Sequence, residues 1–145
     1  MPVECLNFLF NFPDVEKFII IFDKVHKLIE ISLYKTGGFY YGFEENGHTG
    51  YGESGDDVLC AALSSMTMLI VNAIEVSYAS NVDYTIDEKS SDIRLIAKSA
   101  LPKYEKDEKK QFAVSGLIQA YYFQLMDLVE EYYEFLDVKE VEKAL

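Results

Sequence analysis

The sequence contains few of the residues that usually carry cross-links, metals and cofactors. Among its 145 residues there are two cysteines, two histidines and no tryptophan. Cys5 and Cys60 stand in unrelated contexts, and neither is spaced with a histidine in the way that zinc ligands are. The pattern argues against a disulfide framework and against a metal site. We therefore expect reduced thiols, no metal and no cofactor.

Positive charge is scarce as well. Thirteen basic residues against 25 acidic ones give a net charge of -12. Nucleic-acid binding needs a basic surface that displaces counterions, and docking on anionic lipid needs one too. We therefore expect neither nucleic acid nor membrane as a partner, whereas a basic protein would suit the acidic surface.

Long uncharged hydrophobic runs are missing from the first 25 residues. The longest uncharged runs there are Cys5–Pro13 and Phe18–Phe22, well short of the roughly 20 residues that a membrane helix needs. This part also has no basic segment followed by a small-residue cleavage site, so a secretory signal is not indicated. The expected location is the cytoplasm.

Residues 1–26 precede the pattern that organises the rest of the chain. They are an extension that packs on the domain as a short helix over Asp14–Phe22, or upstream sequence included by a start that truly lies nearer Val25. We slightly favour the second interpretation, because the alternating pattern begins only at Lys27. The domain itself is predicted to span residues 27–145.

The remaining chain is long enough for one domain with a real core, and half of all residues are hydrophobic. Its apolar periodicity predicts strands at Lys27–Tyr34, Phe39–Glu45, Val82–Glu88, Ile93–Leu101 and Glu134–Lys143, with helices from Val58 to near Tyr78 and, after a charged lead-in at Lys103–Lys110, to about Tyr133. The pattern at Ile93–Leu101 alone also permits a helix.

The predicted order is β-β-α-β-β-α-β, an α+β fold. Two amphipathic helices cannot bury their apolar faces alone, so a small sheet with two long helices packed on it is the economical arrangement. The first helix is apolar around much of its circumference, which predicts that it is buried.

One short stretch brings together the groups that thiol chemistry requires. His48 lies in a glycine-rich loop, and Cys60 follows twelve positions later near the start of the first predicted helix. With Asp57 as the N-cap, Cys60 would be the third helical residue, facing unpaired amides and the positive end of the helix dipole. These would lower the pKa of the thiol, and His48 would take its proton.

Opposing effects and simpler explanations stand beside this interpretation. The acidic residues Glu53, Asp56 and Asp57 would raise the pKa of the thiol, which leaves the net sign open. A lone cysteine near a helix start is most often a small buried hydrophobic residue. A lone histidine in a glycine loop is most often solvated.

The stretch F-E-E-N-G-H-T-G-Y-G-E-S-G-D-D-V-L-C-A-A-L-S resembles the signature of the ribosomal-processing cysteine protease family, Prp. A Gly-His pair precedes an Asp-x-x-Cys-Ala helix start at the same separation. The matching residues are Gly47, His48, Gly50, Gly55, Asp57, Cys60, Ala61 and Ser64. A weaker resemblance runs from about Lys27 to Val141.

The resemblance implies a homodimeric peptidase that removes an N-terminal extension from large-subunit ribosomal protein L-twenty-seven, cutting after an aromatic pair. It implies His48 as the base and Cys60 as the nucleophile. Asp57 and Ser64 match motif residues that line the site, although Asp57 would also serve as a cap and Ser64 as a packing residue. The amides around Cys60 would form an oxyanion hole.

An aromatic preference implies an apolar subsite, for which the neighbouring candidates are Tyr40, Tyr41, Phe43 and Tyr51. The first three suit a sheet face or a dimer contact equally well. Two non-enzymatic alternatives remain at this point: a binding module of the translation apparatus that only holds the ribosomal protein, and a structural dimer in which Cys60 belongs to the core.

Overall fold

The computed structural model describes residues 28–47, 56–87, 89–90 and 92–145. Its elements are β1 (Ile29–Thr36), β2 (Phe39–Asn46), α3 (Asp56–Asn72), β3 (Asp83–Ile86), β4 (Ile93–Ile96), α4 (Glu108–Tyr132) and β5 (Leu136–Glu142). A π-helical turn, η1 (Ala73–Ser77), continues α3, and a 3-10 turn, η2 (Lys98–Ala100), follows β4. The predicted order and the α+β class are confirmed. The alternatives for residues 1–26 lie outside the described residues.

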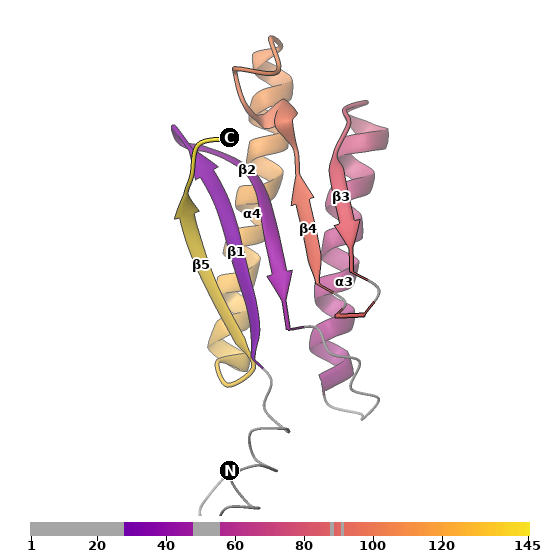
Figure 1. Cartoon of the computed structure of the whole chain (residues 1–145), viewed down its shortest axis with the longest axis vertical. Helices are drawn as coiled ribbons and strands as arrows, with labels where there is room; N and C mark the ends of the chain where they lie inside the picture. The colour runs from indigo at the N-terminus through magenta and orange to yellow at the C-terminus, as the bar shows by residue number, and fades with distance from the viewer. Residues whose placement is uncertain (1–27, 48–55, 88, 91) are drawn as a thin grey trace, which may run out of the picture.

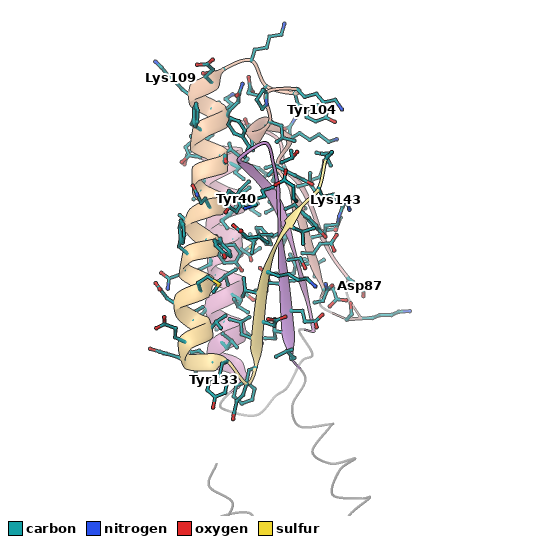
Figure 2. The ribbon with its side chains drawn as sticks, turned by 90° about the vertical axis from the view of Figure 1, so that its left-hand side faces the viewer. Tyr40, Asp87, Tyr104, Lys109, Tyr133 and Lys143 are labelled. Atoms are coloured by element: carbon teal, nitrogen blue, oxygen red, sulfur yellow. The ribbon has the colours of Figure 1, made fainter. Side chains whose placement is uncertain are left out.

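The five strands form one mixed sheet in the order β3-β4-β2-β1-β5 (Figure 1). Strand β5 runs parallel to β1, whereas the other neighbouring pairs are antiparallel. Both helices lie on the same face of the sheet, as the side view shows (Figure 2). The molecule therefore has two layers, one of sheet and one of helices.

The centre of the core is an apolar row that crosses the sheet. Leu33 pairs with Phe43, and Phe43 pairs with Leu95 on the next strand, so the three side chains share one face. All three are fully buried. The ring of Phe43 packs against Tyr121 of α4, with 4.9 Å between ring centroids. This row fixes which face of the sheet the helices cover.

The prediction that the first helix is buried is correct for only one of its sides. Its inner side enters the core, but Val58, Leu69 and Val76 are 61%, 63% and 77% exposed. A helix in a two-layer fold has one side against the sheet and one side away from it, whatever its composition. The segment Val58–Ser77, with a mean hydropathy of 1.7, is the one stretch of the described chain that is long and apolar enough to cross a membrane.

Strand β5 is fastened to the hairpin by Glu140. Its carboxylate accepts a hydrogen bond from the Tyr40 hydroxyl and one of 2.9 Å from Lys35 Nζ. These two donors, the hydroxyl first, hold the pKa of Glu140 below its usual value. Burial, followed by the bond to Glu140, raises the pKa of Tyr40 to about 12, so the phenol stays a donor. The link thus fixes the edge strand β5 to β1 and β2 through side chains as well as through the backbone.

Glu140→Gln should make the protein less stable at pH 7. A carboxyl whose pKa is lower in the folded state stabilises the fold above its unfolded pKa of about 4.3. That contribution is lost as the pH falls through the folded value. Urea denaturation should therefore show a gap between the variant and the parent at pH 7 that closes at more acidic pH. Glu134→Gln, at an exposed position, is the control; a gap that is the same at both pH values would contradict the prediction.

Candidate active site

Cys60 lies near the start of α3 as a thiol, half-buried against the edge of the core. The helix begins at Asp56, so Asp57 is its second residue, and Cys60 is its fifth residue instead of its third. Only the first four amides of a helix lack an intrahelical acceptor. The predicted capping position of Asp57 is thus corrected, and the amide of Cys60 itself falls outside the set that could bind an oxyanion.

Of the other predicted site residues, the structure describes some and leaves others outside the described range. Ser64 follows Cys60 by one helical turn and is exposed. His48 and Tyr51 lie outside the described residues. The pairing of His48 with Cys60 therefore stays a prediction, as do the parts given to Asp57, Ser64 and Tyr51.

Gly47 directly follows β2 and is the last described residue before the glycine-rich segment. The fold requires a glycine at this position. Its φ is +92°, a conformation that L-residues with side chains rarely adopt. A Cβ atom would lie 2.4 Å from the backbone oxygen of Leu28, at the entry to β1. Its amide donates a 3.0 Å hydrogen bond to Asp92 Oδ1, in the β3–β4 turn. The residue before His48 is thus pinned between two other segments.

The aromatic residues next to the motif belong to the core and not to an open subsite. Tyr40, Tyr41 and Phe43 are 6%, 1% and 0% exposed. Tyr41 stacks on Tyr34, and its hydroxyl donates to the backbone oxygen of Lys143. Of the alternatives left open by the sequence, the buried positions of these three residues fit a sheet face that is covered within the single chain, and not an exposed subsite.

A buried carboxylate beside the motif is the feature that sequence reasoning missed. Glu45 is 0% exposed and accepts hydrogen bonds at Oε1 from Thr67 Oγ1 of α3, at 2.7 Å, and from Tyr121 Oη of α4, at 2.6 Å. Burial, and then the charge of Glu45, raises the pKa of Tyr121 well above its usual value. The alternation of side chains along a strand could have revealed this carboxylate: Glu45 lies two residues after Phe43, so both side chains face the helices. Glu45 therefore joins the sheet to both helices.

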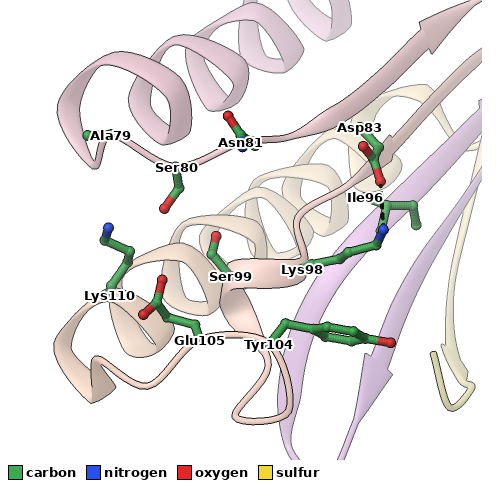
Figure 3. A pocket seen from close by; sticks show the side chains of 10 residues that line it. All are labelled: Ala79, Ser80, Asn81, Asp83, Ile96, Lys98, Ser99, Tyr104, Glu105 and Lys110. Carbon is green, nitrogen blue, oxygen red and sulfur yellow. Dashed lines mark ion pairs between the residues drawn. The ribbon is translucent and has the colours of Figure 1, made fainter.

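A polar hollow of about 440 Å³ lies at the other end of the helix layer (Figure 3). It is lined by the chain after η1, by η2 and by the start of α4, roughly 27 Å along the helix axis from Cys60. Lys98 and Asp83 form an ion pair of 3.4 Å across its wall, with Lys110 and Glu105 nearby. The lining thus carries charges of both signs, and the hollow is separate from the thiol. Among the described residues no cluster of three or more His, Cys, Asp or Glu side chains could hold a metal.

Comparison with known proteins decides the family. Residues 28–137 match the family model of the cysteine protease Prp. The chain belongs to the Prp family. The matched range contains Gly47, His48, Asp57, Cys60 and Ser64, and the protein is thus a cysteine protease.

Solved structures agree with this assignment. The protein SMU.848 from Streptococcus mutans is 30% identical, with 80% of this chain and 99% of that chain covered and a TM-score of 0.65. The essential ribosomal processing protease Prp from S. aureus, in complex with a substrate peptide, is 18% identical, with 79% and 100% covered and a TM-score of 0.63. The second likeness shows the Prp fold. No curated protein sequence matches significantly.

Gly47→Ala should destabilise the protein by clearly more than the about 1–2 kcal/mol that a positive φ alone costs. The added Cβ would meet a backbone oxygen, which cannot move without moving β1. Gly38→Ala is the matched control, since Gly38 also has a positive φ, of +83°, but has open space around its Cβ position. Urea denaturation of both variants measures the difference. Equal losses would show that the contact with Leu28 carries no weight.

Proposed function

We propose that this Prp family member is an endopeptidase that removes the N-terminal extension of the precursor of large-subunit ribosomal protein L-twenty-seven. Cys60 is the nucleophile and His48 the base. The observation that carries the proposal is the position of Cys60: a half-buried thiol near the start of α3, inside the range that matches a cysteine protease family. A thiol closed within the core could not reach a peptide.

The reaction follows the chemistry of thiol peptidases. His48 takes the proton of Cys60, and the thiolate attacks the carbonyl carbon of the scissile peptide bond. The resulting tetrahedral intermediate expels the amine, which receives the proton from His48. A thioester joins the acyl part of the substrate to Cys60, and water then hydrolyses it and restores the thiol.

The related structures support this proposal. The S. aureus Prp, a ribosomal processing protease, has been solved with a substrate peptide and with a covalently linked product peptide. A covalent link between enzyme and product is what attack by a thiolate would leave. The net charge of -12 also suits a basic ribosomal protein, since opposite potentials speed encounter and favour the correct partner. A protein that acts on ribosomal proteins would work in the cytoplasm.

Cys60→Ala and His48→Ala should each lower cleavage of a peptide carrying the extension by about a thousand-fold or more. The fold should persist, because both changes only shorten a side chain. Ser65→Ala, at an exposed position on α3, is the control and should keep full activity. Mass spectrometry of the products measures cleavage. Turnover retained by Cys60→Ala would refute the nucleophile, and a parent that binds the peptide without cleaving it would indicate a binding module instead.

The proposal includes a homodimer formed through the helix layer. Outward-facing apolar side chains occur at Leu69 on α3, at Val76 on η1, at Phe112 and Phe123 on α4, and at Tyr133 directly after α4, with exposed fractions from 57% to 77%. Burying such side chains is the main driving force for association. A second copy would cover them and remove the exposure that the single chain leaves on α3.

Leu69→Glu combined with Val76→Glu should convert the dimer to a monomer, because two buried carboxylates without partners oppose association. Sedimentation velocity at micromolar concentration should show the parent as a dimer and the double variant as a monomer with an unchanged circular dichroism spectrum. Thr85→Glu, on the edge strand β3, is the control and should remain dimeric. A parent that sediments as a monomer would contradict the proposed assembly.

A further inference from the structure

The buried carboxylate of Glu45 holds two segments that lead to the two groups of the proposed dyad. Thr67 lies seven residues after Cys60 on α3, which is two turns along the same side of the helix, or about 10 Å. Glu45 lies two residues before Gly47, or about 7 Å of extended strand, and His48 is the next residue in the sequence. Strand β2 ends at the same end of the molecule at which α3 begins (Figure 1). The bond between Glu45 and Thr67 thus joins β2 to α3 at a point that is a similar distance from Gly47 along the strand and from Cys60 along the helix.

Most of the buried contact between the layers is made by apolar side chains, and apolar packing is not directional. The described buried hydrogen bonds between the layers are the one from the Tyr40 amide to Ser115 of α4 and those to Glu45, of which the bond from Thr67 reaches α3. The hydrogen bonds of 2.7 Å and 2.6 Å to Glu45 have a fixed geometry, and all three side chains are buried, with Thr67 and Tyr121 at 0% and 4% exposed. A buried carboxylate needs its donors, so a shift of α3 along the sheet would cost the bond to Thr67.

The same end of β2 is held from two further sides. The amide of Gly47 is bound to Asp92, and the space for a side chain at Gly47 is filled by the backbone of Leu28. The strand end is therefore immobilised against β1 and the β3–β4 turn. The bond between Glu45 and Thr67 in addition fixes the position of α3, and therefore of Cys60, relative to that end of β2.

We propose that Glu45 is a positioning residue for Cys60: its bond to Thr67 sets the register of α3 against the end of β2, while its bond to Tyr121 holds the carboxylate in place. The inference rests on the proposed function for its effect on turnover. Its effect on the reactivity of Cys60 can be measured without any substrate.

Thr67→Val keeps the volume of the side chain and removes the donor. We expect it to lower kcat by about 10- to 100-fold with little change in KM, because small misplacements of reacting groups reduce rates by such factors. The alkylation rate of Cys60 by iodoacetamide should fall by a similar factor. Peptide mass spectrometry follows Cys60 separately from the second thiol, Cys5. Thr67→Ser restores the hydroxyl and should restore both rates.

Ser115→Ala is the matched control for a purely structural effect. Ser115 is also a buried hydroxyl, 6% exposed, and accepts a 2.9 Å hydrogen bond from the amide of Tyr40 on β2. Its loss should reduce the free energy of unfolding but leave the alkylation of Cys60 unchanged. Tyr121→Phe, which removes a second described donor to Glu45, provides a second measurement if Thr67→Val does not fold.

The outcomes separate this inference from the proposed function. If Thr67→Val and Tyr121→Phe lose stability as Ser115→Ala does and keep kcat and the alkylation rate within about twofold, Glu45 is only a structural residue and the inference is overturned. If the parent cleaves no ribosomal-protein peptide, yet the alkylation rate falls in Thr67→Val and not in Ser115→Ala, the proposed substrate fails and the positioning inference holds.

Discussion

The burial of one face of the sheet under two helices is the constraint on which the rest of the structure depends. The apolar row of Leu33, Phe43 and Leu95 marks that face, and α4 packs on it through Tyr121. Once this face is chosen, the parity of each strand decides which residues enter the interior. Glu45 enters with Phe43 because it lies two positions further along β2. A carboxylate in that buried position needs hydrogen-bond donors from the helices, and Thr67 and Tyr121 supply them.

Near Cys60 the buried interior between the sheet and the helices lies next to the end of β2, which is in contact with several other segments. Gly47 is confined by Leu28 and Asp92, while Glu45 binds both helices. Cys60 lies at the edge of the core, two helical turns from Thr67. Thiol catalysis requires the nucleophile and its base to be held within a narrow range of geometry. The rigid elements of this fold supply such a frame for Cys60, and buried polar contacts between the elements define it.

Covering only one face also leaves apolar surface behind. The outer side of α3 and of η1, which continues it, carries Val58, Leu69 and Val76, although the sequence is apolar around much of the helix circumference. Exposed apolar side chains gathered on a helix layer are typical of surfaces that bind another protein. The two-layer architecture and the proposed homodimer are thus connected by one physical cause, the burial of α3 on a single side.

The sequence by itself determined the order of the elements, the α+β class and the family. Apolar periodicity is local, so it was sufficient for the strands and helices. The cysteine protease assignment came from the resemblance of the stretch with Gly47, His48, Asp57 and Cys60 to the Prp signature, because the spacing of His48 and Cys60 alone left simpler explanations open. The two-residue change at the start of α3 arises because helix ends depend on caps and context, which a pattern defines only loosely.

Only the tertiary structure decided how the elements meet. The parallel pairing of β5 with β1 joins residues about a hundred positions apart, and the bond from Tyr121 to Glu45 joins residues 76 positions apart. The exposed side of α3, the core location of Tyr40 and the steric need for Gly47 are likewise set by neighbours distant in sequence. Periodicity shows which side of an element is apolar, but long-range packing decides which partner covers that side. The role of Glu45 depends on long-range packing for the same reason.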